Sequence, residues 1–390
     1  MEPRNYVLFS ALYAPHMGGV EAYTAGMAHE LVERGNSATV VTSRLSSASP
    51  ECETQEDGVR IVRLPSRVLM GGRLPMPLRN ARMAQLLEEV TAENPDRVVV
   101  NTRFYGMSLE GLRYAKERTL PAVMLEHGSA SLSLGSVLAD RALNAYETLM
   151  TKRVKAYAPT FAGVSQAACA WLGHFGIKTS RVVPNALDAQ AYRASASARD
   201  FRNELGVRED DLLVAVVGRL IPEKGIQAVL EAARRIEGDE SFASCMPRRI
   251  VFAIAGDGAL LDQVKAAEAQ TTAVKALGRL PVSDVAALLR ASDIYLLPSR
   301  SEGFATTLLE ACAMGAYPIT TDVGGVAELG IGRLGGIVLP DASAASIIAA
   351  LQVAGEMHGL CRQQAATLQA NAARENTWGK SVEALESLFS

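Results

Sequence analysis

Two glutamates in the second half of the sequence, Glu302 and Glu310, have a spacing that suits recognition of a polar ligand. Glu302 follows the apolar run 293–297, in an expected strand-to-helix loop, and Glu310 lies inside the expected helix. Eight helical residues span at most roughly 12 Å, so the two carboxylates can contact separate parts of one extended ligand. Carboxylates accept charge-assisted hydrogen bonds from sugar or ribose hydroxyls.

The residues around these glutamates favour a ligand site. Gly303 permits close approach of the backbone to a ligand, and the N-terminus of the following helix offers N–H donors without intrahelical partners. The alternative is that Glu302 only caps the helix and that Glu310 is an ordinary exposed residue. For Glu310 this is disfavoured, because its helix reads Leu308-Leu-Glu-Ala-Cys-Ala313 and is mostly apolar.

A second loop, Gly218-Arg-Leu-Ile-Pro-Glu-Lys-Gly225, carries two cations after an almost wholly apolar run. Arg219 can bond two phosphate oxygens at once, whereas Lys224 acts as a mobile point charge. The spacing is neither that of a Walker phosphate loop nor that of a GxGxxG dinucleotide turn. We therefore expect a phosphate site here, with a solvated loop bearing two surface cations as the alternative.

Paired glycines follow the first expected strand, in Ala14-Pro-His-Met-Gly-Gly-Val-Glu21. At a helix N-terminus, Gly18 and Gly19 would let backbone N–H groups approach an anion, which the helix dipole also favours. A tight strand-to-helix turn without a ligand would have the same sequence.

Short apolar runs alternate with helical patterns along the chain, which predicts parallel sheets covered by helices. The expected strands of the first half are 6–11, 38–42, 59–64, 97–101, 122–125 and 161–164, and its expected helices are 21–34, 81–93, 109–117, 138–157 and 166–174. The second half contributes the expected strands 212–217, 250–255, 274–277, 293–297 and 317–320, each separated by a helical segment.

The alternation pauses at Ala194-Ser-Ala-Ser-Ala198, which indicates two domains. We expect an N-terminal Rossmann-like domain over 1–190 and a C-terminal one over 191–375. Doubly wound α/β domains bind ligands at the carboxyl ends of their strands. Two such domains facing across a cleft would suit a large substrate.

The composition excludes several classes of protein. A chain of 390 residues suits two domains, and its net charge of −3 argues against a dedicated nucleic-acid binder. The five cysteines show no CxxC or metal-ligand spacing, which predicts buried thiols in a reducing compartment. No apolar run approaches the ~18 residues that span a bilayer, so we expect a cytoplasmic protein.

Taken together, these segments resemble glycosyltransferase family 4, retaining nucleotide-sugar transferases with the GT-B fold. The resemblance covers nearly the whole chain, and the pair of glutamates is its most specific feature. Ala305 departs from the family pattern, where a second Gly or Ser is frequent, and so does Ala316-Tyr-Pro-Ile319. The segments that carry the resemblance are, in order, Gly18-Gly19 with Glu21, Gly218-Arg219 with Lys224-Gly225, Ala255-Gly-Asp-Gly258, Glu302-Gly-Phe with Glu310-Ala, and Thr321-Asp-Val-Gly-Gly-Val-Ala-Glu328.

The resemblance implies roles for individual residues in the donor site. Arg219 and Lys224 would hold the donor diphosphate, Glu310 the ribose, and Glu302 a sugar hydroxyl. His127, in Leu125-Glu-His-Gly128 at the end of an expected strand, would lie beside the transferred sugar, although a lone histidine is more often structural. The implied catalytic residues are His127, Glu302, Arg219 and Lys224, and the other implied donor-binding residues are Gly18, Gly19, Gly303, Phe304, Ala305 and Glu310.

The activity implied by the resemblance is transfer of a hexose with retention, from a UDP-sugar ahead of a GDP-sugar. The acceptor would be a hydroxyl in cell-envelope polysaccharide or glycolipid synthesis, bound by the first domain. The C-terminal helix 376–390 would pack back on that domain. No metal site or cofactor is expected, because the nucleotide sugar is a substrate and the two cations can replace a metal.

Other functions remain open as alternatives. A nucleotide-sugar epimerase shares the two-domain architecture, and a glycosyltransferase of this family can also use a soluble acceptor. A degenerate partner subunit is disfavoured because the charged residues are all present. A nicotinamide oxidoreductase is disfavoured because GxGxxG is absent.

The segment 59–87 carries six arginines and no acid, interleaved with aliphatic residues. Each cation near an anionic membrane adds about 1 kcal/mol of binding, and aliphatic side chains enter the interface. The hypothesis is peripheral binding to the inner face of the membrane, with a solvated surface loop as the alternative. The arginines concerned are Arg60, Arg63, Arg67, Arg73, Arg79 and Arg82.

Overall fold

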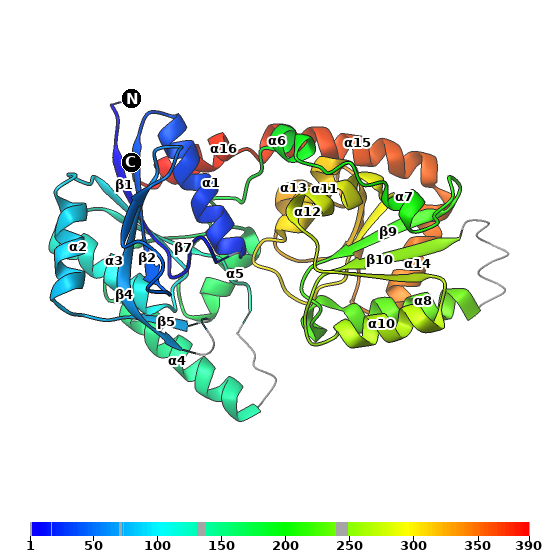
Figure 1. Ribbon diagram of the computed structural model, residues 1–390, viewed down its shortest axis with the longest axis horizontal. Coiled ribbons are helices and arrows are strands. Elements are labelled where there is room, and N and C mark those ends of the chain that lie inside the picture. The colour runs from blue at the N-terminus through cyan, green and yellow to red at the C-terminus, as the bar shows by residue number, and fades with distance from the viewer. Residues whose placement is uncertain are drawn as a thin grey trace. The chain divides into compact units, whose positions relative to one another are not determined.

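The computed structural model describes residues 2–16, 18–69, 72, 74–130, 137–238 and 249–389, with the backbone alone for 137–139. The chain divides into two compact units, one formed by Met1–Ala186 with Trp378–Ser390 and the other by Leu187–Thr377 (Figure 1). The second unit begins slightly before the expected residue 191. Asp188 explains this, because its side chain accepts from Ala191 N at 2.8 Å and caps the first helix of that unit.

The first unit is built on an eight-stranded sheet in the order β3-β4-β2-β1-β6-β7-β8, with β5 paired to β4. Its strands are parallel except β3 and β5, which run antiparallel to β4. The strands are β1 (Asn5–Phe9), β2 (Ser37–Arg44), β3 (Cys52–Thr54), β4 (Arg60–Leu69), β5 (Leu74–Pro77), β6 (Arg97–Asn101), β7 (Ala122–Glu126) and β8 (Thr160–Gly163). The helices are α1 (Gly19–Glu33), α2 (Ala81–Thr91), α3 (Gly106–Glu117), α4 (Val137–Lys155), α5 (Gln166–His174) and α16 (Trp378–Glu386).

The second unit is built on a six-stranded parallel sheet in the order β11-β10-β9-β12-β13-β14. The strands are β9 (Leu212–Val217), β10 (Ile250–Ala255), β11 (Val274–Gly278), β12 (Ile294–Leu297), β13 (Tyr317–Thr321) and β14 (Ile337–Leu339). The helices are α6 (Ala189–Ala194), α7 (Phe201–Glu204), the short 3-10 helix η2 (Pro222–Lys224), α8 (Ile226–Gly238), α10 (Leu261–Gln270), α11 (Val282–Ala291), α12 (Thr306–Met314), α13 (Val326–Leu329), α14 (Ala344–Glu356) and α15 (His358–Glu375).

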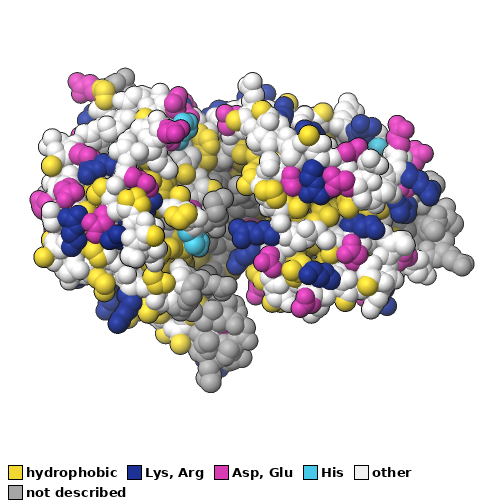
Figure 2. Space-filling model, viewed as in Figure 1, with side chains coloured by type: hydrophobic (Ala, Val, Ile, Leu, Met, Phe, Trp, Pro, Cys, Tyr) yellow, Lys and Arg dark blue, Asp and Glu magenta, His cyan; other side chains and the backbone are white. Residues whose placement is uncertain are grey.

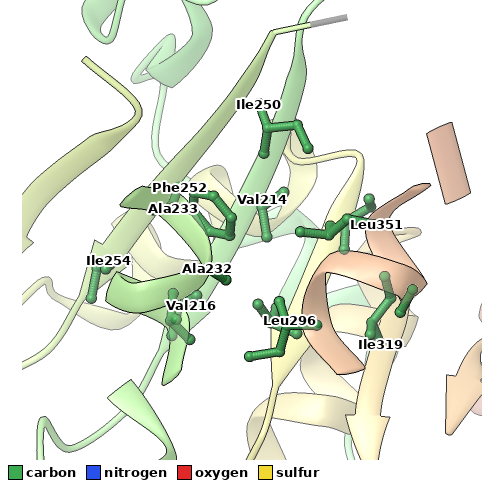
Figure 3. Close-up of a cluster of buried hydrophobic side chains, with 14 of the residues drawn as sticks. Val214, Val216, Ala232, Ala233, Ile250, Phe252, Ile254, Leu296, Ile319 and Leu351 are labelled. Carbon is green, nitrogen blue, oxygen red and sulfur yellow. The ribbon is translucent and has the colours of Figure 1, made fainter. Parts of the chain in front are cut away.

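The core of the second unit explains why β9 lies at the centre of its sheet. A parallel strand covered by helices on both faces needs a continuous apolar run, and β9 pairs with both β10 and β12. Two alanines of α8 let that helix approach the sheet closely. Figure 3 shows side chains from the sheet, α8 and α14 meeting in one cluster, which includes Val214, Val216, Ala232, Ala233, Ile250, Phe252, Leu296, Ile319 and Leu351.

Each sheet has one point where the strand order reverses direction. In the first unit it lies between β1 and β6, and in the second unit between β9 and β12. The carboxyl ends of the strands at such a point form the usual ligand crevice of an open α/β sheet. The topology therefore directs attention to the loops after β1 and β6 and to the loops after β9 and β12.

Helix α16 belongs to the first unit although it follows the second in sequence, and it packs against α1 (Figure 1). Its first residue, Trp378, lies edge-on to Tyr23 with ring centroids 5.7 Å apart. A side chain at Gly26 would collide with the Trp378 indole, so this glycine makes room for the helix. Ser381 also donates a hydrogen bond of 2.7 Å to Pro184 O.

Three strands were not expected from the sequence: β3, β5 and β14. All are short, and β5 contains two prolines, which are rare inside strands except at sheet edges. Among the described helices, none is on its own long and apolar enough to cross a bilayer. Taken together, α14 and α15, which meet at 98°, reach that length and composition.

Candidate functional site

The loops after β9 and β12 bring two of the predicted site residues together. Lys224 Nζ and Glu302 Oε1 form an ion pair, although 78 residues separate them in the sequence. The side chains are 20% and 13% exposed, so the pair lies at the solvent edge of the sheet rather than in the core. A carboxylate and an ammonium at this edge can each exchange their partner for a ligand.

Backbone contacts hold the two loops at this distance. Arg300 N donates to Glu223 O at 2.8 Å, which joins the β12 loop to the β9 loop. Gly225 has φ 70°, and a Cβ there would collide with Pro298 O, so both its conformation and its surroundings require glycine.

Arg219 lies on the same loop as Lys224 but differs from it in exposure and in ion pairing. Its side chain is exposed. No carboxylate among the described residues forms an ion pair with it, whereas Lys224 is paired with Glu302. The loop therefore presents one free guanidinium and one ammonium that already has a partner.

The segment 302–305 passes from the loop into helix α12. Gly324 N donates to Glu302 O at 3.1 Å and Ala305 N donates to Gly324 O at 2.8 Å, so the loop after β13 packs against this segment. Phe304 and Ala305 are buried. Helix α12 begins without a side-chain cap, which leaves N–H groups of its first turn for a ligand.

Glu310, inside α12, has a partner that the sequence analysis missed. Tyr192 of α6 donates its hydroxyl proton to Glu310 Oε2 at 3.1 Å. Burial raises the pKa of Glu310, and the Tyr192 hydrogen bond opposes this by favouring the carboxylate. Helix α6 could have been recognised from its capping residue Asp188, but the pairing of Tyr192 with a residue 118 positions away could not.

The predicted residues Gly18 and Gly19 lie where helix α1 begins, after β1. The helix begins at Gly19, with Gly18 as its N-cap. The Glu21 side chain folds back against Gly18 and lies 3.2 Å from His16. This carboxylate already occupies part of the positive helix end, whereas a side chain at Gly19 would meet nothing within 4 Å.

His127 follows β7, one strand away from the reversal point of the first sheet. Its Nε2 lies 2.8 Å from Asn101 Oδ1, and its ring packs edge-on to Tyr23 at 4.9 Å between centroids. Burial lowers the pKa of His127 to about 3, so the ring is neutral near pH 7.

A buried charge network supports the strand end that carries His127. Arg103 is fully buried and forms ion pairs with Glu126 and Glu147. The other oxygen of Glu126 accepts from Gly128 N at 2.7 Å, so the network fixes the backbone on both sides of His127. The sequence around Arg103 does not indicate this burial, because a single arginine after a strand is typical of a surface loop.

The arginine-rich segment is not the row of free cations that its sequence suggests. Acids from outside 59–87 pair with four of the six arginines, and Arg63, which the membrane hypothesis included, is buried and therefore not available to a membrane. In the view of Figure 2, most Lys and Arg side chains of the first unit lie beside Asp or Glu side chains. The ion pairs are Arg60–Glu93, Arg63–Glu53, Arg79–Glu110, and Arg82 with Glu51 and Glu89.

Two of these arginines differ from the other four. Arg67 is exposed and makes no ion pair with a described residue, while Arg73 lies outside the described part of the chain. Val68, Leu69 and Leu78 are exposed near Arg67, on β4 and after β5.

Other features of the described residues are less informative about chemistry. A cavity of about 970 Å³ runs beside α3 and α4 and is lined by residues such as Arg79, Leu109 and Tyr157, but by none of the residues predicted to bind the donor. Of the cysteines, Cys52 is exposed, contrary to expectation, and Cys245 lies outside the described residues. The described residues contain no group of three or more His, Cys, Asp or Glu able to hold a metal ion.

Two doubly wound α/β units in one chain are the architecture of the GT-B glycosyltransferases. Solved structures of that class match it. The Anabaena protein HepE in complex with UDP-glucose aligns with a TM-score of 0.70 at 20% identity, covering 99% of each chain.

Sequence comparisons identify the family to which the chain belongs. The family described as Glycosyltransferase Family 4 matches residues 17–191, and Glycosyl transferases group 1 matches residues 197–368. An uncharacterized glycosyltransferase of Methanocaldococcus jannaschii, MJ1069, is 23% identical over 100% of this chain and 99% of its own. A D-inositol 3-phosphate glycosyltransferase of Geodermatophilus obscurus is 26% identical over 95% of this chain and 84% of its own. The chain belongs to glycosyltransferase family 4, and it is a glycosyltransferase with the GT-B fold.

Proposed function

We propose that the second unit binds a nucleotide-diphosphate sugar, with a UDP-sugar preferred to a GDP-sugar. The observation that carries this proposal is the ion pair between Lys224 and Glu302, beside the free guanidinium of Arg219. HepE, which shares the fold, was solved with UDP and with UDP-glucose. A diphosphate carries negative charge on both phosphates, and this loop offers two cations that can contact them.

Binding of the donor would then proceed as an exchange of partners. The diphosphate oxygens take Lys224 from Glu302, because the two phosphates of a nucleotide sugar together carry two negative charges and a carboxylate carries one. Glu302 is released to accept a hydrogen bond from a hydroxyl of the sugar. Arg219 adds a second, forked contact to the phosphates. Gly303, Phe304 and Ala305 shape the same pocket through their backbone.

Glu310 completes the proposed donor site by accepting from the ribose hydroxyls. Tyr192 occupies one oxygen of the carboxylate and leaves the other for the ligand. Because burial raises the pKa of Glu310, this contact is expected to weaken in acid.

In the first unit, we propose that Gly19 approaches the reacting phosphate or sugar and that His127 contacts the transferred sugar. The departing nucleoside diphosphate is stabilised by Arg219 and Lys224, which act in place of a metal ion. The acceptor hydroxyl attacks the anomeric carbon on the face that the diphosphate leaves, so that the configuration is retained.

We further propose that the acceptor is a lipid-linked or cell-envelope glycan. Arginines that are already paired with carboxylates have little charge left for an anionic membrane, so the surface proposed to contact it is the β4–β5 hairpin. Exposed Arg67 supplies the cation, and exposed Val68, Leu69 and Leu78 supply the apolar side chains.

Thermal unfolding in the presence of UDP, GDP, their sugars, AMP and NAD tests the donor assignment. A ligand at 100 times its Kd raises stability by about 2.7 kcal/mol, so UDP should shift the second unit clearly and AMP and NAD should not. No shift with any nucleoside diphosphate would contradict the assignment. A conversion of the nucleotide sugar without acceptor would favour the epimerase, and a reversible loss of transfer with EDTA would reveal a metal requirement.

A further inference from the structure

The polar groups around His127 form a chain of hydrogen bonds whose direction can be worked out atom by atom. Thr24 Oγ1 donates its only proton to Val20 O at 2.7 Å. Its contact with Asn101 Nδ2, at 3.2 Å, must therefore be one in which the amide donates. This places Asn101 Oδ1 against His127 Nε2 at 2.8 Å. A carbonyl oxygen only accepts, so Nε2 carries the proton.

We infer that Asn101 and Thr24 form a one-way relay that holds His127 as the Nε2–H tautomer and leaves its Nδ1 as an acceptor for a substrate hydroxyl. The tautomer is a property of the free protein, whereas the contact of Nδ1 with a substrate hydroxyl rests on the proposed place of His127 beside the transferred sugar. Asn101 and Thr24 act on the substrate only through His127 and are positioning residues.

The relay lies in the core, which makes its direction hard to reverse. Thr24 is fully buried and Asn101 nearly so. A reversed amide would point its NH₂ group at His127 and its carbonyl at a hydroxyl whose proton is already used, leaving buried groups without partners. The direction of the relay is therefore fixed by the backbone carbonyl at its far end.

The charged and titratable groups around the ring leave it neutral. Tyr23, from α1, contacts it with a ring edge and donates its own hydroxyl toward Val183 O at 3.4 Å. Glu126, the preceding residue, is committed to Arg103 and to Gly128 N. No described carboxylate pairs with the imidazole, and its pKa is lowered to about 3.

A neutral Nδ1 has a defined chemical preference. It accepts a hydrogen bond from a hydroxyl, but it has no proton for a phosphate or carboxylate oxygen. His127 would thus recognise a substrate hydroxyl by accepting its hydrogen bond. It would not act as an acid or as an electrostatic partner of the leaving diphosphate. A substrate in which the contacted hydroxyl is replaced by fluorine, which cannot donate, should be used poorly.

Nitrogen NMR of the full chain labelled with ¹⁵N-histidine tests the relay without any ligand. The His127 signals are assigned by their loss in His127→Gln. We expect the Nε2–H tautomer, unchanged between pH 8 and pH 5. An Nδ1–H tautomer, or a titration of this ring near pH 6.5, would overturn the relay.

Two variants test whether Asn101 and Thr24 determine the tautomer of His127. In Asn101→Asp, a carboxylate beside Nε2 should raise the pKa of His127 and make the ring titrate within the same pH range. In Thr24→Val, the amide loses its fixed acceptor and a mixture of tautomers should appear, so either variant suffices if the other does not fold.

Transfer is then measured with the nucleotide sugar that gives the largest thermal shift. Asn101→Asp should lower kcat/KM by about 10-fold, the loss of one hydrogen bond, and more at acid pH than at alkaline pH. Normal transfer by a folded Asn101→Asp would overturn the contact with substrate. An absence of transfer by the wild-type protein would contradict the proposed function, whereas the tautomer result would stand.

Discussion

The two units differ in how far the ion pairs near their predicted site residues are exposed to solvent. At the reversal point of the second sheet, Lys224 and Glu302 pair at the solvent edge with 20% and 13% of their side chains exposed. In the first unit, Arg103 and Glu126 are fully enclosed and Glu147 is 3% exposed. The Lys224–Glu302 pair therefore lies where partners can be exchanged, and the Arg103 network lies where they cannot.

The difference in burial determines what each pair can do. A pair at the edge is partly hydrated before and after exchange, so a phosphate can replace the carboxylate at little desolvation cost. A pair in the core has given up its water, and removal of one partner leaves an uncompensated charge. We therefore propose that the Lys224 pair takes part in ligand binding and that the Arg103 network holds the strand end at His127.

The largest effect is expected from breaking the buried network. Arg103→Met should lower the free energy of unfolding of the first unit by about 3–5 kcal/mol, because two carboxylates lose their partner. Arg34→Met is the matched control, since the Arg34 pairs with Glu30 and Glu383 are partly exposed, and it should lose less than about 1 kcal/mol.

Urea unfolding followed by tryptophan fluorescence measures this directly. The chain has two tryptophans, Trp171 and Trp378, and both belong to the first unit. Exchange of Glu126 and Glu147 for Gln in the Arg103→Met background should restore part of the loss. If Arg103→Met unfolds at the same urea concentration as Arg34→Met, the contrast between the two regions is wrong.

Breaking the exchangeable pair should affect binding and leave the fold intact. Lys224→Ala and Arg219→Ala should each lose roughly 1.5–3 kcal/mol of nucleoside diphosphate binding, the value of a hydrogen bond to a charged group. Calorimetric titration with UDP measures it, with the exposed Lys265→Ala of α10 as control.

Glu302→Gln tests whether Lys224 exchanges the Glu302 carboxylate for a phosphate when the donor binds. Without its carboxylate partner, Lys224 is free before the donor arrives, so UDP should bind as tightly as to the wild type or more tightly, while transfer falls. Weaker UDP binding by Glu302→Gln would show that the glutamate contacts the nucleotide and that no exchange of partners takes place.

A smaller effect is expected at Glu310, a single carboxylate whose pKa is raised by burial. As pH falls through its raised pKa, the carboxylate takes up a proton and ceases to accept from both ribose hydroxyls. Tyr192→Phe removes the hydrogen bond that lowers this pKa, so the loss of UDP binding should begin at a higher pH than in the wild type.

The expected difference in binding at the acid end is about 1 kcal/mol, the value of one neutral hydrogen bond. It is read from UDP dissociation constants at several pH values. Glu310→Gln serves as the control and should bind more weakly with no pH dependence of this origin. Identical pH profiles for Tyr192→Phe and the wild type would remove Tyr192 from the site.

The sequence predicted the fold well where a local pattern is sufficient. The wholly apolar run 212–217 forms β9 exactly over that range, because a strand buried on both faces admits no polar residue. The expected charged loops also lie at the carboxyl ends of β9 and β12. This placement follows from the alternation of strands and helices, which fixes the edge at which such loops occur.

The parts that could not be predicted depend on contacts between distant residues. Arg103 has the sequence context of a surface loop, and its burial is determined by acids 23 and 44 positions away. The arginines of 59–87 have no acid nearby in sequence, yet the sheet brings Glu93, Glu53, Glu110 and Glu51 to them. Charge counted along a segment does not give the charge of a surface.

The smallest effect is expected for the membrane proposal. Here the comparison is between an arginine without an ion pair to any described residue and a paired arginine of the arginine-rich segment. Arg67 is exposed without a carboxylate partner among the described residues, whereas Arg60 is paired with Glu93. A cation near an anionic surface adds about 1 kcal/mol, but only where its charge is not already compensated. Arg67→Gln should therefore weaken co-sedimentation with anionic vesicles by up to about 5-fold at low salt, and Arg60→Gln should weaken it less.

The difference between these two variants should vanish at high salt, because exposed charges are then screened within a few ångströms. Vesicles of neutral lipid provide the baseline for the apolar contribution of Val68, Leu69 and Leu78, which carries no salt dependence of this kind. Equal and negligible binding of the wild type to both vesicle types at low salt would leave Arg67 as ordinary surface charge. The acceptor would then be sought among soluble sugars, and the ion pairs of the segment would be sufficient explanation for its arginines.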